Sequence, residues 1–480
     1  MDLNKKGINP LEENDSLITE TGKSFRDRVS SIDTKGKRIW IYPSKPSGRF
    51  HARRLIVGYF FLALYLILPF IKYNGQPYFL FDLINRKFII FGSIWWPQDF
   101  YMLAIGLLTL AVFIVLFTAV FGRIWCGWAC PQLIVMELVY RKIEYWIEGD
   151  AGKQKALNAQ KLDGAKFIKK LSKLSIFMLI AIALNAIFLS YIFGIDEVWH
   201  VISSAPSAHA GEYITVIVFT LAFYLNYSWF REQACTYVCP YGRLQSVLLD
   251  KNSIVVGYDF KRGEPRGKLS HGQVAEGNGS CVDCGFCVRV CPTGIDIRNG
   301  IQLECVGCTN CIDACDHIMD KTNQPRGLIR YTSESNIVDG SKFKMTPRLI
   351  FYTVILTALI TLMTVLMVRR TDVEATILRA RGSTFIVKDN GNIVNIFSMK
   401  LMNKTHLDKQ LEFKTEEHHG VFTFPGMDKV VLKSESLLEG TFLLEIPKAE
   451  LKRTNNRVTI GIYSEGKLID KVKTTFSEPK

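Results

Sequence analysis

Five long runs of apolar residues divide the chain. They cover residues 55–71, 101–121, 174–194, 213–229 and 349–368. Each run approaches the roughly 20 apolar residues that an α-helix needs to cross the hydrocarbon core of a bilayer. We therefore predict five transmembrane helices. Residues 132–147 are also partly apolar, but Glu137, Arg141 and Glu144 interrupt them. We interpret this stretch as an interfacial helix and not as a sixth span.

The Lys and Arg residues are distributed unevenly over the loops. They number 12 in residues 1–54, three in 72–100, ten in 122–173, none in 195–212 and 15 in 231–348. Because loops rich in Lys and Arg stay on the cytoplasmic side, we expect the N-terminus and the two rich loops inside and the end of the chain outside. Arg369 and Arg370 oppose this orientation weakly. The net charge of +14 lies in these loops, so it indicates a lipid bilayer as the partner and not a nucleic acid.

The pattern changes to short strands after residue 371. Apolar, β-forming runs lie at 384–388, 393–397, 421–424, 441–446 and 458–463. Residues 389–392 and 464–467 have the composition of tight turns. Roughly seven strands in about 110 residues are typical of an immunoglobulin-like sandwich. The predicted fold class is a multi-domain membrane protein with a five-helix α transmembrane domain and a C-terminal all-β sandwich.

All twelve cysteines fall in four motifs between Cys126 and Cys315. Two motifs are consecutive C-x2-C-x2-C-x3-C runs, and such a run supplies three thiolates to one [4Fe–4S] cluster and its fourth to the neighbouring cluster. Zinc favours two cysteine pairs with a long spacer, so the spacing argues against a zinc ribbon. We predict two clusters with these ligands: Cys281, Cys284, Cys287 and Cys315 for one, and Cys305, Cys308, Cys311 and Cys291 for the other.

The other two motifs are C-x-x-x-C-P pairs that repeat after 109 residues: Cys126 and Cys130 before Pro131, and Cys235 and Cys239 before Pro240. If these stretches are helical, each pair shares one helix face, and each proline loosens the following turn. The repeat predicts that the pairs meet as one four-thiolate site at the inner edge of the membrane. Soft thiolates select Cu(I), zinc or an iron–sulfur cluster, whereas the alternative is that these cysteines only pack. Copper and a third cluster both remain open.

These patterns predict the domain organisation. The expected parts are a cytoplasmic segment at 1–54, a four-span membrane domain at 55–250, a cytoplasmic two-cluster ferredoxin-like module with linkers at 251–348, a fifth transmembrane helix at 349–368 and a periplasmic immunoglobulin-like domain at 371–480. Within the module, the Gly-rich residues 251–280 are interpreted as a polar linker. This topology keeps every cysteine in a reducing compartment, as iron–sulfur ligands require, and leaves the outer domain free of cysteine.

Several motifs together resemble one known family. They are residues 42–49, 125–132, 235–241, 258–267 and 326–334, combined with the double cysteine run. The combination resembles the cytochrome c oxidase accessory proteins of the FixG/CcoG/RdxA type. The resemblance implies a bacterial inner-membrane protein that matures cbb3-type oxidase and reduces Cu(II) to Cu(I) for the oxidase copper centre. It implies that oxidase subunits or copper-delivery proteins are partners and that the residues facing copper or a cluster are Cys126, Cys130, Cys235 and Cys239.

Three functions are compatible with these features. The first is a cupric oxidoreductase that receives electrons from an unidentified cytosolic donor. The second is a membrane quinol dehydrogenase subunit that passes electrons through ferredoxin clusters. The third is a non-catalytic scaffold that docks oxidase subunits through residues 371–480. Reduction of Cu(II), oxidation of quinol, or neither activity would distinguish the three.

Overall fold

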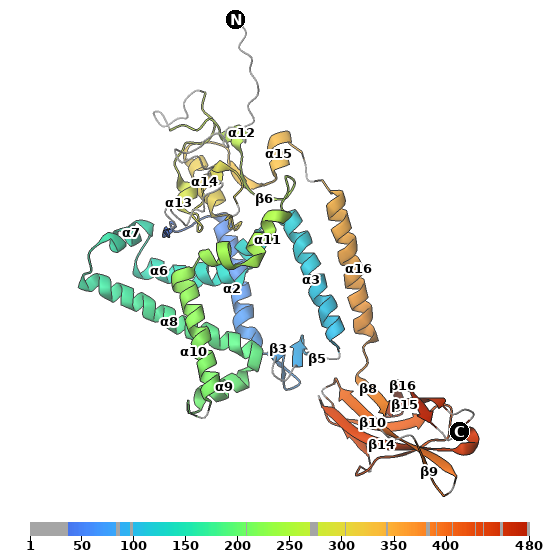
Figure 1. Cartoon of the computed structure of the whole chain (residues 1–480). Coiled ribbons are helices and arrows are strands. Elements are labelled where there is room, and N and C mark those ends of the chain that lie inside the picture. Colours follow the sequence, from blue (N-terminus) through green and yellow to red (C-terminus); the bar gives the residue numbers. More distant parts are fainter. Residues whose placement is uncertain are drawn as a thin grey trace. The chain divides into compact units, whose positions relative to one another are not determined.

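The computed structural model describes residues 37–477, apart from 83–86, 97–98, 208, 269–276, 303, 342–343, 381–384, 390, 406, 428, 435 and 452–454. Most of the predicted N-terminal segment therefore lies outside the described residues, as do Thr384 and Asn390 of the first predicted hairpin. The chain divides into two compact units (Figure 1). One combines Met1–Phe70 with Gly106–Leu359, and the other combines Ile71–Ile105 with Ile360–Lys480.

Among the described residues, five helices are long and apolar enough to cross a membrane, which confirms the predicted number. They are α2 (Arg49–Ile67, extended by a 3-10 turn to Phe70), α3 (Phe100–Phe121), α8 (Gly164–Phe193), α10 (Ala210–Leu225, extended by a π-helical turn to Phe230) and α16 (Pro347–Arg369). The helix α8 begins at Gly164 and not at residue 174. Its extra turns are stabilised because the Nζ atoms of Lys170 and Lys173 lie 2.8 and 2.9 Å from the Glu148 carboxylate.

The stretch predicted as an interfacial helix is buried and contributes no membrane span. It consists of α5 (Pro131–Val135), a π-helical turn (Met136–Tyr140) and α6 (Arg141–Ile147). Arg141 is only 2% exposed and pairs with Glu137 at 2.7 Å. Arg231 donates two hydrogen bonds to the Glu144 carboxylate, at 3.0 and 2.8 Å. Buried partners within the protein, and not water, therefore satisfy these charges.

The ferredoxin module is closed by two strands from its opposite ends. β6 (Val255–Tyr258) pairs antiparallel with β7 (Ile329–Thr332). Between them lie α12 (Phe260–Gly263), α13 (Phe286–Arg289), a 3-10 turn (Ile297–Asn299) and α14 (Asn310–Lys321), and α15 (Glu334–Asp339) follows. Val256 and Tyr258 are buried in the module core. The interpretation of 251–280 as a linker was therefore wrong for its first part, and residues 269–276 lie outside the described residues.

Asp313 on α14 joins the module to the first membrane helix. Its carboxylate oxygens accept hydrogen bonds from the backbone N–H groups of Phe50 (3.1 Å) and His51 (2.7 Å) at the start of α2. These N–H groups have no partner within the helix, and a carboxylate there also complements the helix dipole. Gly48 permits the approach, because a Cβ atom there would lie 2.2 Å from the Asp313 Cγ atom. This cap explains why α2 begins before its apolar run.

The second unit contains the predicted immunoglobulin-like sandwich (Figure 1). A five-stranded sheet has the order β12-β14-β10-β8 with β9 on β10, and a four-stranded sheet has the order β13-β11-β15-β16. The tight turn before β16 is confirmed, since Glu465 and Gly466 both have positive φ, as a type I′ turn requires. The strands are β8 (Val373–Arg379), β9 (Ile386–Val387), β10 (Asn392–Asn403), β11 (Lys409–Thr415), β12 (Val421–Thr423), β13 (Val430–Leu432), β14 (Leu437–Pro447), β15 (Asn455–Ser464) and β16 (Lys467–Ser477).

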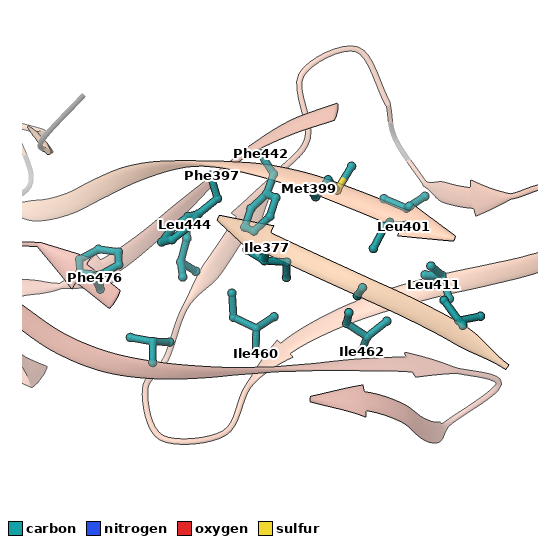
Figure 2. Packing of buried hydrophobic residues seen from close by; sticks show 14 of the residues in the cluster. Ile377, Phe397, Met399, Leu401, Leu411, Phe442, Leu444, Ile460, Ile462 and Phe476 are labelled. Atoms are coloured by element: carbon teal, nitrogen blue, oxygen red, sulfur yellow. The ribbon is translucent and has the colours of Figure 1, made fainter. Parts of the chain in front are cut away.

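The two sheets enclose an apolar core (Figure 2). Phe397 on β10 and Phe442 on β14 are opposite each other in the register, and their rings stack at a centroid distance of 5.5 Å. A polar pair also bridges the sheets. The buried Asn395 side chain donates to the Ser477 carbonyl at 2.9 Å and accepts from the Ser477 N–H at 3.2 Å. A buried amide without partners is costly. These two hydrogen bonds therefore favour one position of the end of β16 relative to β10 in the other sheet.

The same unit includes short strands from residues 71–105. They are β1 (Lys72–Tyr73), β2 (Gln76–Pro77), β3 (Phe79–Asp82), β4 (Lys87–Ile90) and β5 (Ser93–Trp95). Asp99, which is 2% exposed, lies 2.8 Å from the Arg370 guanidinium and 2.6 Å from Lys404 Nζ. The buried Asp99 carboxylate therefore neutralises two cations that come from the end of α16 and from the loop after β10.

Candidate functional site

The two ferredoxin cysteine runs have the same backbone conformation. Asp283 and Gly307, at equivalent places in the two runs, have φ of 47° and 66°. Gly285 and Thr309, also equivalent, have φ of 63° and 64°. Left-handed residues within a loop turn successive N–H groups toward one concave side, as in many iron–sulfur sites. The runs therefore fold as two copies of one cysteine loop.

The structure brings the eight ferredoxin cysteines together in two groups. The strongest thiol neighbours of Cys315 are Cys281, Cys284 and Cys287. One cavity is lined by Cys291, Cys305, Cys308 and Cys311, and Cys287 reaches the same cavity. The fourth cysteine of each run thus lies beside the first three of the other run. This grouping has the cross-connected arrangement that the spacing predicts, and none of the twelve cysteines forms a disulfide.

The thiols of the second group are deeply buried. Burial raises the pKa of Cys305 to about 11 and that of Cys308 to about 12. Cys311 is affected in the same direction, because burial and the neighbouring thiols raise its pKa well above the ordinary value. Four buried thiolates repel one another, so they require a positively charged group between them. An iron–sulfur cluster meets this requirement, because its iron ions supply the positive charge between the thiolates.

The membrane cysteine pairs do not lie on continuous helices. The helix α4 (Ile124–Trp128) ends before Cys130, which is extended with ψ of 122°, and α5 starts at Pro131. The second motif repeats this geometry, with Cys239 at ψ of 111° and α11 (Pro240–Leu248) starting at its proline. The expectation of one shared helix face was wrong. A residue before proline avoids the α conformation, and proline is favoured at the first position of a helix.

The four membrane-motif thiols nevertheless form one cluster, which we call the four-thiol site: Cys126, Cys130, Cys235 and Cys239. Cys235 is influenced electrostatically by the other three thiols, and burial raises its pKa to about 12. Burial also raises the pKa of Cys126 to about 11. The Gln245 side chain, which is fully buried, places its Nε2 atom 3.5 Å from the Cys126 sulfur. Gln245 is thus a polar neighbour of the site that the sequence pattern did not indicate.

The four-thiol site and the second ferredoxin run are in direct contact. Cys126 packs against a buried apolar cluster that joins Leu133 to Val306 and Cys308. The close approach depends on Gly127, where a Cβ atom would lie only 2.6 Å from the Gly307 carbonyl oxygen. The contact therefore leaves no layer of protein between the motif that carries Cys126 and the loop that carries Cys308.

Two buried arginines supply positive charge at this contact. The Arg54 Nε atom donates to the Gly127 carbonyl at 2.7 Å, and its charge acts to lower the pKa of Cys308. Arg123 donates to the Gly242 carbonyl and acts on Cys126, Cys235 and Cys305 in the same direction. Sequence reasoning missed both residues. The available signals were an arginine at the edge of the first apolar run and another three residues before Cys126.

No three His, Cys, Asp or Glu side chains among the described residues converge closely enough to hold a single metal ion. An iron–sulfur cube does not require such convergence, because each of its four irons takes one cysteine and the sulfur atoms stand apart around it. The donor chemistry at both ferredoxin groups is thiolate only, which fits iron–sulfur clusters.

Comparison with family models agrees with this chemistry. A "4Fe-4S dicluster domain" matches residues 230–334, which contain all eight ferredoxin cysteines and the second membrane pair. A "4Fe-4S binding domain" matches residues 103–154, which contain Cys126 and Cys130. The immunoglobulin-like fold found at the C-terminal end of FixG matches residues 363–479.

Three relatives match most of the chain. The nitrogen fixation protein FixG of Rhizobium meliloti is 34% identical over 428 residues, which cover 80% of this chain and 81% of the relative. The chain belongs to the FixG family. Protein RdxA of Cereibacter sphaeroides is 34% identical over 80% of this chain and 84% of its own. Protein RdxB of the same organism is 31% identical, over 92% of this chain and 98% of its own. This FixG-family chain is a membrane iron–sulfur electron-transfer protein.

Proposed function

We propose that this FixG-family protein carries electrons from its ferredoxin module to the four-thiol site and that these electrons reduce Cu(II) to Cu(I) for assembly of a cbb3-type cytochrome c oxidase. The observation that carries the proposal is the direct contact between the motif that contains Cys126 and the loop that contains Cys308, which share one apolar cluster. A direct contact keeps the transfer distance short. The missing side chain at Gly127 allows this contact, because any larger residue would separate the motif of Cys126 from the loop of Cys308.

The proposed ligands of the two ferredoxin clusters follow from the observed grouping. One set is Cys281, Cys284, Cys287 and Cys315, and the other is Cys291, Cys305, Cys308 and Cys311. When bound, such clusters supply one-electron storage and transfer. The chain itself buries the thiols against water, and Arg54 and Arg123 favour their charged form at the contact with the four-thiol site.

For the four-thiol site, we propose a third iron–sulfur cluster in preference to resident copper. The family model that includes Cys126 and Cys130 is described as a 4Fe-4S binding domain, which supports this choice. Four soft thiolates suit such a cluster, and neither pair alone supplies four ligands. Copper is then the substrate: each Cu(II) takes up one electron and leaves as Cu(I). The electrons come from a cytosolic donor, and the copper passes to oxidase subunits or a copper-delivery protein.

We propose an orientation in the inner membrane with the ferredoxin module in the cytoplasm and the immunoglobulin-like domain in the periplasm. The asymmetry of Lys and Arg between the loops supports it. A reporter enzyme that is active only in the periplasm, fused after Lys480, is expected to be active. Activity of a cytoplasmic reporter at that position would contradict the orientation.

The central experiment measures metal content and copper reduction together. Anaerobically purified protein is analysed for iron and copper, reduced with dithionite, desalted, and mixed with Cu(II) and a chelator specific for Cu(I). We expect an iron excess above two clusters and formation of Cu(I). Alanine replacement of Cys126 and Cys130 should abolish reduction as fully as replacement of all four membrane-motif cysteines, because residues that act as one unit are not additive.

The control is Thr236→Ala, which alters the second motif without removing a thiol and should leave the activity unchanged. If each single-pair variant retains about half of the activity, the idea of one joint site is refuted. Oxidation of quinol without copper reduction would instead favour a quinol dehydrogenase subunit. If neither activity occurs while the clusters are intact, the protein is an assembly scaffold.

A further inference from the structure

An apolar cavity of about 210 Å³ is lined in part by residues of the first C-x-x-x-C-P motif. Its wall is formed by α2, by the segment of α4 and α5, and by one residue of α8. The lining residues are Phe61, Leu62, Leu64, Tyr65 and Leu68 of α2, Trp125, Ala129, Pro131, Ile134 and Val135 of α4 and α5, and Tyr191 of α8. All of these residues belong to the first unit. We propose that this cavity binds the ring of a lipid-soluble quinone.

The location of the cavity determines which ligands can reach it. Its α2 residues belong to a helix that is long and apolar enough to cross the membrane. Leu64 and Trp125 are 43% and 44% exposed, so the cavity opens on a side of the helix that the bilayer covers. A water-soluble ligand would have to enter through hydrocarbon, whereas a ligand dissolved in the membrane enters directly.

The shape and the lining favour a planar ring. The volume exceeds the roughly 150 Å³ of an apolar cavity that accepts benzene, so a substituted single ring fits. Four lining residues are aromatic. The rings of Tyr65 and Tyr191 stack at 5.7 Å with an interplanar angle of 21°, and Trp125 meets Phe61 edge-to-face at 6.2 Å. Aromatic faces and edges of this kind accommodate another planar ring by offset or edge contacts.

One polar group in the wall is available to a ligand carbonyl. The Tyr191 hydroxyl is engaged, since it donates to the Tyr65 carbonyl at 2.7 Å. The Tyr65 hydroxyl has only a long contact of 3.4 Å to the Leu184 carbonyl. A hydroxyl with so weak a partner can turn to donate to a quinone oxygen at little cost. A lipid acyl chain would make no use of this donor or of the four aromatic rings.

The cavity also adjoins the proposed redox centre. Trp125 directly precedes Cys126, and Ala129 and Pro131 flank Cys130. A ring in the cavity would therefore lie against the residues that directly adjoin Cys126 and Cys130 in the chain. The inference does not depend on copper reduction, because binding is measured without any copper.

The test uses the purified full chain in detergent, with decylubiquinone as the probe and calorimetry as the measurement. We expect saturable binding by the unchanged protein. Leu64→Trp fills the cavity and should weaken binding at least about tenfold, which corresponds to about 1.4 kcal/mol. Leu66→Trp is the matched control: the same change on the same helix, at a residue that does not line the cavity. It should weaken binding less than about twofold.

Equal binding by the two variants, or no binding by the unchanged protein, would overturn the proposal. Displacement of the probe by decanol, which has the chain but no ring, would identify an acyl-chain cavity instead. Photolabelling of the unchanged protein with an azido-quinone is an independent test. It decides whether the cavity binds a quinone even if the Leu64→Trp variant misfolds. Labelled peptides should contain residues 61–68, 125–135 or Tyr191, and labelling confined to other segments would refute the site.

Discussion

Gly127→Ala tests the contact between the four-thiol site and the ferredoxin module. Gly127 lies in α4 and is not among the residues with positive φ, so its backbone conformation does not require glycine. What requires it is space. An added Cβ atom would lie 2.6 Å from the Gly307 oxygen, 2.7 Å from the Gly307 carbonyl carbon and 2.8 Å from the Val306 oxygen. All three are backbone atoms, so no side chain can turn away to relieve the clash.

The expected effect combines two opposing contributions. Overpacking of a tight contact costs about 1–3 kcal/mol. Replacing glycine with alanine inside a helix regains about 0.5–1 kcal/mol. From the middle of both ranges, the net loss of docking free energy is about 1.2 kcal/mol, which corresponds to a roughly eightfold rise in the population of the undocked state. The added methyl group should also lengthen the path between Cys126 and Cys308.

Hydrogen exchange of the peptide that contains residues 304–310 measures the docking directly, and the rate of Cu(I) formation measures its consequence. Gly152→Ala is the matched control, because Gly152 lies in α7 (Ala151–Ala159) and a Cβ atom there meets nothing within 4 Å. The control should leave exchange at 304–310 and the reduction rate unchanged. If Gly127→Ala behaves like Gly152→Ala in both measurements, the direct contact does not exist in solution and the proposed transfer route fails.

Three further predictions concern other parts of the chain. Cys305→Ala should leave fewer than two intact low-potential [4Fe–4S] centres by electron paramagnetic resonance, and two intact centres would refute the ligand assignment. Asp313→Ala should remove the cap of α2 at a cost of about 0.5–2 kcal/mol, seen as earlier thermal loss of cluster absorbance, while Asp313→Asn should retain most of it. Asp99→Ala leaves Arg370 without a carboxylate partner, while Lys404 keeps Glu374, and it should destabilise the second unit by about 3 kcal/mol in a proteolysis assay. Lys400→Ala, which breaks an exposed ion pair in the same unit, should cost less than about 1 kcal/mol, and equal sensitivity of the two variants would contradict the buried cluster.

The sequence by itself determined the features that depend on local patterns. Five membrane helices follow from the length of the apolar runs, because the thickness of the hydrocarbon sets how many apolar residues a span needs. The β-sandwich follows from short apolar runs separated by turn residues, because strands that pack on one core are short and end at turns. The cysteine spacing likewise predicted the chemical type of the cofactor, since the ligands of each run lie within a few residues of one another. For the same reason, the turn at 464–467 could be located without any knowledge of its surroundings.

Only the tertiary structure decided which distant groups meet. The charges on residues 137–144 indicated an amphipathic, interfacial helix, and only the fold shows that Arg231, far along the chain, neutralises Glu144. The start of α2 depends on Asp313, some 260 residues away, and no local signal near Arg49 reveals it. Gly127 has an ordinary helical conformation, so its need for glycine appears only when Gly307 is placed against it. In each case the energy depends on a partner that becomes near only when the chain folds.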